Sequence, residues 1–460
     1  PGELMNTAIK SMLNDLDPYT KFHNEQDVES FKINNSGEYT GIGATIKRKD
    51  GRLFIIEPFK GYPADKAGLK AGDEIIQIDN IKVANYKDDT TSLLKGAKNS
   101  TVKIYFIRQG KKKETQLTRA SVEVNAVPFY KLIDNSTGYI VLSKFNQKAF
   151  TQTKKAIQSL KQEGAKQLIL DLRGNPGGLL RESIRIVNLF VPKGEVIVTT
   201  KSKIKKYNKT YKTSEKPLDT KIPLAILVNE RSASASEIVS GALQDLDRAI
   251  IVGSRSFGKG LVQRPKNLTY GTQLKVTISR YYTPSGRCIQ ALDYKNRDEK
   301  GNAIRTNESS YTAFKTKNGR TVYDGGGVDP DIKVDKNKLS NISKALIKEQ
   351  IIFNFCTDYY YKNPDILLKE FSFSDEEYDV FKNYVSSSKF VYETGTEKYV
   401  KNLEKQAITD NIDINTELKV LKKQIARAKK EALTSNKKEL TRLITNELVT
   451  RYYYKEGLYN

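Results

Sequence analysis

The sequence predicts an α/β protein of several domains, and three observations support this. The chain has 460 residues, well beyond the ~150 typical of one domain. Strand-like runs alternate with helical patterns between about residues 127 and 335, as in an α/β layer. Beyond that point, long Lys/Glu/Leu-rich stretches have helical spacing. We therefore expect an N-terminal helical segment at 1–34, a β-rich module at 35–119, an α/β core at 120–335 and a basic helical domain at 336–460.

The first two segments differ in their apolar pattern. Met5, Ile9, Met12 and Leu16 are spaced as on an amphipathic helix, which ends at Asp17–Pro18. Between about 36 and 119, short β-branched runs alternate with Gly/Asp/Asn turns, which favours a small β-module with one short helix at Pro63–Leu69. These runs are 44–46, 53–56, 74–78 and 102–107.

The α/β core is predicted from two strand–helix–strand repeats. The runs 139–145 and 167–172 flank a helical stretch at 151–164. The runs 222–228 and 249–252 flank another at 235–247. Strands that alternate with helices favour parallel pairing in one sheet. In the C-terminal domain, apolar stripes at 418–432 and 440–448 predict helices with a lysine-rich solvent face.

Composition excludes several classes of protein and mechanism. Lys and Arg exceed Asp and Glu by 78 to 54, and the net charge of +24 favours acidic partners or anionic surfaces. No nucleic-acid module is recognisable, so we expect no nucleic-acid partner. No apolar run approaches the ~20 residues of a membrane helix, so an integral membrane protein is not expected. The chain begins at Pro1 without a recognisable export signal, and the two cysteines give no disulfide framework or metal spacing.

Histidine gives a sharper exclusion. His23 is the only histidine of the chain, so a His-rich metal site or a pair of imidazoles is ruled out by count. A general base at neutral pH then has to be a carboxylate with a raised pKa or a lysine with a lowered one. We expect no metal and no cofactor.

The β-module carries a possible peptide-binding pattern. In Gly41-Ile42-Gly43-Ala44 the glycines permit a turn whose N–H groups converge, which suits a carboxylate. Together with the segment 63–73 and the strand after it, this pattern resembles a PDZ domain. The resemblance implies that a chain terminus is captured as an added strand, with its carboxylate on the amides of Ile42, Gly43 and Ala44. The alternative is an ordinary glycine-rich hairpin without a ligand.

Ser234 is the first candidate for chemistry in the core. It follows the buried run 222–230 and directly precedes a predicted helix. The unpaired N–H groups and the positive end of such a helix stabilise an anion, so the position suits a nucleophile. The same residue with Glu237 also forms a capping-box pattern, and serines at helix starts are more often caps than catalysts.

The segment 253–260 is the second candidate. Gly253 and Gly258-Lys259 have the spacing of a phosphate-binding loop after a strand. However, position 260 is Gly, so the hydroxyl expected to hold Mg²⁺ is absent, and 261–265 makes a poor helix start. Alternatively, Lys259 lies between glycines so that its amine is desolvated and neutral, and it then takes a proton from a serine hydroxyl.

These residues, in this order, resemble the carboxyl-terminal processing peptidases, or tail-specific proteases, which use a serine–lysine dyad. The resemblance spans roughly 16–332 and is carried by runs at 16–20, 138–140, 170–178, 232–245, 252–263, 281–287 and 330–332. It implies Ser234 as nucleophile, Lys259 as base and Gln263 as the residue that orients the lysine; Ser232 and Ser236 flank without that role. It also implies an oxyanion hole from the N–H of Ala235 with that of Gly177 or Gly178, and a core with ClpP/crotonase-like βαβ layers.

The resemblance further implies a serine endopeptidase that cleaves the C-terminal tails of envelope proteins. The PDZ domain would capture these mostly apolar tails or gate the site. The enzyme is expected in the periplasm or cell envelope of a bacterium, and a homodimer or higher oligomer remains open. The alternative from another class is a catalytically silent PDZ scaffold or adaptor.

Overall fold

The structure, a computed structural model, describes residues 2–86, 90–299, 301–334, 339–364, 366 and 372–459. The chain divides into two compact units, each built from two stretches of sequence. Unit 1 contains 1–39 and 123–336, and unit 2 contains 40–122 and 337–460. The domain boundary expected between 335 and 336 lies outside the described residues.

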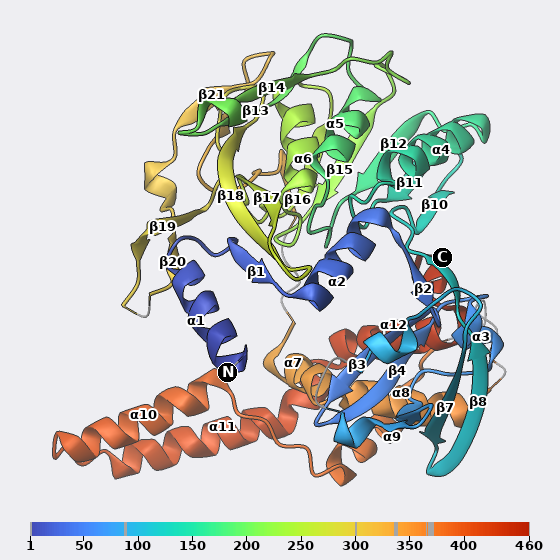
Figure 1. Ribbon diagram of the computed structural model, residues 1–460. Helices are drawn as coiled ribbons and strands as arrows, with labels where there is room; N and C mark the ends of the chain where they lie inside the picture. The colour runs from blue at the N-terminus through green and yellow to red at the C-terminus, as the bar shows by residue number, and fades with distance from the viewer. Residues whose placement is uncertain are drawn as a thin grey trace. The chain divides into compact units, whose positions relative to one another are not determined.

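A six-stranded sheet forms the centre of unit 1 (Figure 1). Its order is β10-β11-β12-β15-β16-β23, parallel from β11 onward, with β10 antiparallel at one edge. The strands are β10 (Phe129–Leu132), β11 (Thr137–Val141), β12 (Gln167–Asp171), β15 (Leu224–Val228), β16 (Ile250–Gly253) and β23 (Ile332–Lys333). Crossover helices α4 (Ala149–Gln162), α5 (Leu180–Asn188) and α6 (Ala235–Asp245) connect or flank these strands. The parallel α/β layer expected from the sequence is therefore present.

A second sheet in unit 1 was not predicted from the sequence. Its order is β1-β18-β13-β14, and β17 also pairs with β18. These strands are β1 (Lys21–His23), β13 (Val196–Lys201), β14 (Lys209–Lys212), β17 (Leu261–Asn267) and β18 (Gln273–Tyr282). Helix α6 contacts both β13 of this sheet and β16 of the parallel sheet. It is buried along its whole length because it lies between the two sheets (Figure 1).

The N-terminal segment belongs to unit 1. Helix α1 (Gly2–Asn14) precedes β1, and helix α2 (Glu25–Ser36) follows it. Strand β1 pairs antiparallel with the start of β18. Two small hairpins complete the unit after β18: β19 (Leu292–Arg297) with β20 (Ala303–Arg305), and β21 (Ala313–Lys315) with β22 (Thr321–Tyr323).

Unit 2 combines a β-sheet with the C-terminal helices. The sheet order is β3-β4-β5-β7-β8, with β6 paired to β5. Its strands are β3 (Ala44–Lys49), β4 (Arg52–Pro58), β5 (Glu74–Ile78), β6 (Ile81–Lys82), β7 (Thr101–Arg108) and β8 (Lys111–Thr118). The helix expected at Pro63–Leu69 is shorter, α3 (Pro63–Lys66), because the chain turns at Gly68, which has a positive φ of 73°. Strands β2 (Glu38–Gly41) and β9 (Ala120–Glu123) pair with each other where the chain passes between the units.

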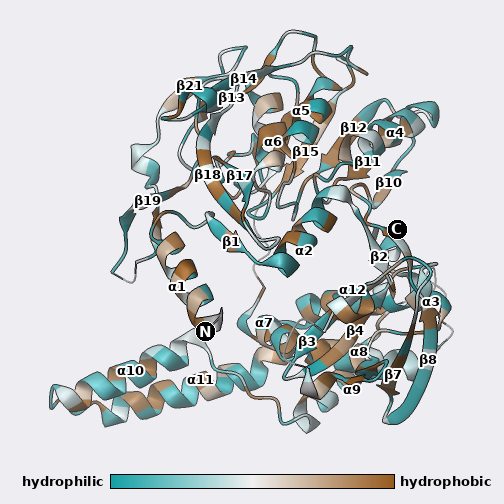
Figure 2. Ribbon diagram, in the orientation of Figure 1, coloured by the Kyte–Doolittle hydropathy of each residue, from teal (hydrophilic) through white to brown (hydrophobic). Residues whose placement is uncertain are grey.

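In the C-terminal part of unit 2, the described residues include the α-helices α7 (Asn341–Lys348), α8 (Ile351–Lys362), α9 (Asp375–Ser387), α10 (Gly395–Thr409), α11 (Asn415–Ser435) and α12 (Lys437–Tyr453). Polar residues cover most of α10 and α11, whereas apolar residues gather on the strands and the packed helices (Figure 2). The helices are tied to the sheet part by Tyr454, whose hydroxyl donates to Asp65 at 2.7 Å, and by the Lys455–Glu57 ion pair at 2.8 Å. Among the described residues, no helix is long and apolar enough to span a bilayer.

Candidate active site

Ser234 lies at the turn between β15 and α6, as the sequence predicts. Its backbone has φ 57° and ψ −112°, a region that non-glycine residues rarely occupy and that costs of order 1–3 kcal/mol. Its side chain is half-buried, while Ser232 and Ser236 on either side are fully buried. The Ser232 hydroxyl donates to Leu172 O and the Ser236 hydroxyl to Asn175 O. Of these three serines, Ser234 is therefore the one whose hydroxyl remains available to react.

The carboxylate of Glu237 connects the turn at Ser234 with the segment that carries Lys259. It is completely buried and accepts four hydrogen bonds. The donors are the N–H of Ser234 (2.8 Å), the hydroxyl of Ser256 (2.5 Å), the N–H of Gly258 (2.6 Å) and the N–H of Lys259 (2.9 Å). Burial raises the pKa of Glu237, and the donors oppose this rise because they favour the carboxylate. Glu237 therefore caps α6 and also holds the segment 256–259.

The segment with Lys259 is an extended connection between β16 and β17, not the start of a helix. It packs against the backbone at 290–291: Gly258 O accepts from Ala291 N, and Gly260 N donates to the side chain of Gln290. A Cβ on Gly258 would lie 2.2 Å from the Ala291 Cβ, and φ there is +88°. The phosphate-binding interpretation fails here because the helix that would hold phosphate at its N-terminus is absent from this described segment.

The amine of Lys259 is partly removed from water. It lies 4.7 Å from the centre of the Tyr19 ring. Its pKa is lowered to about 8, first by burial and then by the charge of Lys275, while Glu237 raises it. The pKa of Lys275 is itself lowered by burial and by Lys21. An amine with this pKa has a substantial neutral fraction at neutral to mildly alkaline pH, as a general base requires.

Tyr19 is held in place by a turn that the sequence motif at 16–20 forms. The buried carboxylate of Asp17 accepts hydrogen bonds from the N–H groups of Tyr19 and Thr20 and from the hydroxyls of Thr20 and Thr277. The motif at 16–20 predicts no role for Tyr19. Its ring beside the lysine amine is a functional contact that no sequence spacing indicated.

Two expected contacts do not form. Within the described chain, no hydrogen bond joins the Lys259 amine to the Ser234 hydroxyl, and the side-chain nitrogen of Gln263 is buried without a partner. Strand β17 has an irregular register between Val262 and Gln263, which sets the direction of that side chain. His23 lies in β1, its Nε2 is buried without a partner, and burial lowers its pKa, so it takes no part in a triad with Ser234.

The glycine loop after β12 lies against the turn at Ser234. A Cβ on Gly177 would lie 2.6 Å from Ala233 O and 2.9 Å from both Ala235 N and the Ser234 Cβ. The N–H of Gly177 donates to the side chain of Asn175, and Asn175 O accepts from Ala233 N. In contrast, the N–H groups of Gly178 and Ala235 have no acceptor among the described residues. Asn175, whose role the sequence analysis missed, therefore joins this loop to the serine turn.

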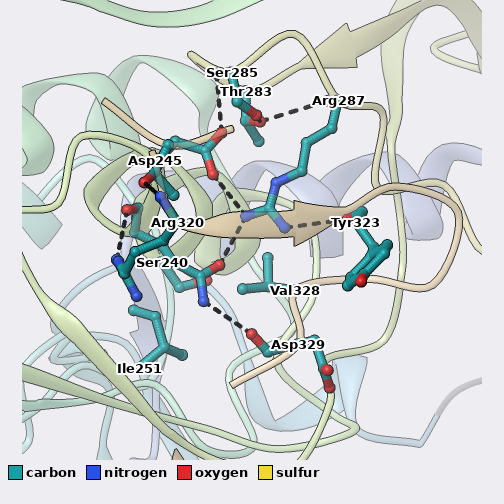
Figure 3. Close-up of polar contacts among 12 residues, drawn as sticks. Ser240, Asp245, Ile251, Thr283, Ser285, Arg287, Arg320, Tyr323, Val328 and Asp329 are labelled. Carbon is teal, nitrogen blue, oxygen red and sulfur yellow. Dashed lines mark hydrogen bonds and ion pairs between the residues drawn. The ribbon is translucent and has the colours of Figure 1, made fainter. Parts of the chain in front are cut away.

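A buried ion pair fixes the other end of α6 (Figure 3). Arg287 and Asp245 are fully buried, and their charged atoms lie 2.7 Å apart. Arg287 also donates to the side chain of Gln244 and to Tyr323 O, and the N–H of Ser285 donates to Asp245. The motif at 281–287 thus anchors the helix that begins at the candidate serine. The Tyr281 hydroxyl reaches the Ser234 carbonyl at 3.3 Å.

Comparisons with known proteins agree with this site. The profile described as "Peptidase family S41" matches residues 136–296, and "PDZ domain" matches 40–118. A third profile, "Probable PDZ-protease, C-terminal helical domain", matches 342–460. The chain is 32% identical over 340 residues to "Carboxy-terminal processing protease CtpA" of Bacillus subtilis, covering 73% of this chain and 71% of the relative. The chain belongs to peptidase family S41.

Two further proteins are similar to this S41 peptidase. It is 36% identical over 296 residues to a "Probable CtpA-like serine protease" of Staphylococcus haemolyticus, covering 63% of this chain and 58% of the relative. A solved structure described as photosystem II D1 C-terminal processing protease is 28% identical and covers 74% of this chain and 83% of its own, with a TM-score of 0.42. The chain is thus a CtpA-like serine protease with a PDZ domain and a C-terminal helical domain, which favours an enzyme over a silent scaffold.

Proposed function

We propose that this S41 peptidase cleaves polypeptides near exposed, mostly apolar C-terminal tails, with Ser234 as nucleophile and Lys259 as general base. The observation that carries this assignment is the shared carboxylate of Glu237, which binds the backbone of both residues. The neutral amine of Lys259 takes the hydroxyl proton, and Ser234 Oγ attacks the peptide carbonyl. The protonated amine then gives its proton to the leaving amine, and water activated by the same lysine releases the acyl-enzyme.

The oxyanion of the tetrahedral intermediate is assigned to the N–H groups of Ala235 and Gly178. Of the two glycines that the sequence left open, Gly177 already donates to Asn175, which supports Gly178. Two aligned donors in a water-poor site stabilise a developing oxyanion by several kcal/mol. Gln263 remains the proposed partner of the lysine, since its buried and unpartnered nitrogen lies four residues beyond Lys259 on β17.

The PDZ domain is proposed to capture the tail. Strand β3 is at the edge of its sheet in the strand order of unit 2, so an extended peptide can pair with it. The segment Gly41-Ile42-Gly43-Ala44 runs from the end of β2 to the first residue of β3 and would hold the terminal carboxylate. A tail on this site would also gate cleavage by shifting the position of Lys259 relative to Ser234.

We further propose that the two-sheet core of unit 1 has ClpP/crotonase-like layering, and that the enzyme works outside the bacterial cytoplasm on envelope proteins. The two sheets with α6 between them support the layering. The relatives come from bacteria, which supports a bacterial host for this enzyme. The resemblance noted in the sequence supports a location outside the cytoplasm.

The assignment is tested with a reporter protein that ends in an apolar tail. Ser234→Ala and Lys259→Met are each expected to lower the cleavage rate by at least about a thousandfold, whereas Lys154→Met, at an exposed position of α4, keeps the rate. Retained cleavage by Ser234→Ala would overturn the assignment of the nucleophile. A tail peptide that saturates the PDZ domain without changing the cleavage rate would show that this domain holds the substrate and does not gate cleavage.

A further inference from the structure

A groove of about 1220 Å³ lies in unit 1 on the β17–β18 hairpin. Besides the hairpin, it is lined by the segment 201–207, which follows β13, and by Tyr294. Leu274, Val276, Ile278 and Arg280 of β18 line it at alternate positions, and Thr277 and Ser279 between them also reach it. Successive side chains of a strand point to opposite faces. Lys275, which acts on Lys259, and Tyr281, which bonds Ser234, therefore belong to the other face.

The basic side chains of the groove are exposed and form what we call its rim, whereas Leu261, Leu274, Val276 and Ile278 are buried or half-buried and form what we call its floor. Its lining contains six basic side chains and no Asp or Glu: Lys201, Lys203, Lys206, Arg264, Lys266 and Arg280. None of the six forms an ion pair with a carboxylate in the described part of the chain. The apolar side chains of the lining are Ile204, Leu261, Pro265, Leu274, Val276 and Ile278. A site of this kind matches a ligand that offers both carboxylates and apolar side chains.

The backbone around the groove favours an extended polypeptide as that ligand. Among the described strands, β17 pairs only with β18, so its other edge is open to an added strand. Pro265 lies within β17, a residue that strands tolerate at an edge. In an extended acidic segment added at this edge, every second side chain would face the groove, where carboxylates would meet its basic side chains and apolar residues its apolar ones.

We propose that this groove is a second binding site for polypeptide, which takes an acidic, extended segment with interspersed apolar residues. This proposal depends on the proposed function in one respect: it takes the bound acidic segment to be part of a substrate of the peptidase. A second copy of the chain is disfavoured because two such grooves facing each other would bring six cations against six. An anionic bilayer is disfavoured because a flat surface reaches the rim of a groove and leaves its apolar floor uncovered.

The test uses the full chain with Ser234→Ala, so that binding is measured without turnover. The probe is a fluorescein-labelled twelve-residue peptide of alternating Glu and Val, amidated at its C-terminus so that it lacks the carboxylate that a PDZ domain holds. We expect it to bind, and the matched Gln/Val peptide to bind at least about tenfold more weakly because its charge is removed.

Two matched triple variants locate the site. Lys203→Gln, Lys206→Gln and Lys266→Gln together remove three rim charges and should weaken binding about tenfold. Lys154→Gln, Lys155→Gln and Lys166→Gln change the net charge equally at exposed positions outside the groove and should change affinity less than twofold. Equal losses in the two triples, or equal binding of the Gln/Val peptide, would overturn the proposal.

Further measurements distinguish the proposed polypeptide ligand of the groove from a membrane or a second copy of the chain. They also test the groove separately from the catalytic assignment. Groove-dependent binding to phosphatidylglycerol vesicles without peptide binding, or groove-dependent self-association in sedimentation, would overturn the proposal in favour of a membrane or a second copy. With Ser234 intact, the groove triple should keep the cleavage rate of a reporter that has an apolar tail and no acidic segment. Should Ser234→Ala still cleave, the proposed function fails while the peptide-binding result stands.

Discussion

The buried carboxylate of Glu237 accepts a hydrogen bond from the backbone N–H of Lys259 at 2.9 Å. Through its other bonds, the same group holds the N–H of Ser234 and the loop at 256–258. Two segments that are 25 residues apart in the chain (259 − 234) therefore share one anchor. The position of the amine relative to the hydroxyl depends on this carboxylate, although Glu237 takes no part in the proposed proton transfer.

Replacing this anchor should impair catalysis more than binding. In Glu237→Gln the amide has one acceptor oxygen for four donors, and each lost bond to a charged group is worth about 1.5–3 kcal/mol. We expect kcat to fall by about ten- to a hundredfold, with little change in KM. Ser256→Ala, which removes one of the four donors, should cost less than Glu237→Gln. Steady-state kinetics on both variants, with thermal unfolding as a fold control, decides this; an unchanged kcat in Glu237→Gln contradicts it.

The rate should rise with pH through the titration of Lys259. Its pKa is lowered to about 8 by burial and by the charge of Lys275, and the base acts in its neutral form. Activity is then low below this pH and reaches a plateau above it, so kcat/KM at pH 6 should be about one hundredth of the plateau. A profile from pH 6 to 9.5 on an amide substrate measures this. A rate that is flat or falls over that range would contradict the assignment of the base.

Removing the charge of Lys275 should shift that profile toward alkaline pH. Lys275 lies beside Lys259 and disfavours its protonated form, so Lys275→Met should raise the pKa of Lys259. The expected result is a rate at pH 7 that is about two- to fivefold lower, with an unchanged plateau. Lys154→Met, which changes an exposed lysine of α4, serves as the control with no shift. A lower plateau without a shift would indicate a structural effect instead.

Stability of unit 1 should depend strongly on Arg287. Its ion pair with Asp245 is fully buried, and removal of one partner leaves an unpaired buried charge, which costs about 3–5 kcal/mol. Arg287→Met should therefore lower the free energy of unfolding by that amount in urea titrations. Lys317→Met breaks the more exposed pair with Glu195 and should cost at most about 1 kcal/mol. Equal losses of unfolding free energy in the two variants would contradict the larger contribution expected from the buried pair.

The sequence predicted the parallel layer and the serine position because each has a local signal. Buried runs at 167–172 and 222–228 and the serine-rich helix start are readable from apolar pattern and motif. The second sheet was missed, although Leu274-Lys275-Val276-Thr277-Ile278 alternates apolar and polar residues as a half-buried strand does.

Contacts between distant segments had no such signal. The Tyr19 ring beside Lys259 joins residues 240 positions apart (259 − 19), and the bond from Ala233 N–H to Asn175 O joins residues 58 positions apart (233 − 175). The positive φ of Ser234 also follows from packing on the loop at 175–177, since a serine has no intrinsic preference for that conformation. Local sequence patterns indicate contacts between residues that are close along the chain. The contacts of Tyr19 and Asn175 join distant residues and follow from how the layers pack.

Two glycines of the same loop offer a matched test of how closely that loop approaches Ser234. Gly174 and Gly177 both have positive φ, 74° and 95°, so an alanine at either position costs about 1–2 kcal/mol in backbone strain. A Cβ at Gly174 meets nothing within 4 Å, whereas one at Gly177 would lie 2.6 Å from Ala233 O and 2.9 Å from Ala235 N. Gly177→Ala must therefore displace the turn that carries the nucleophile and one proposed oxyanion donor. We expect kcat to fall at least about a hundredfold in Gly177→Ala and less than threefold in Gly174→Ala, with similar losses of thermal stability. Equal kcat values in the two variants would show that this loop does not shape the site.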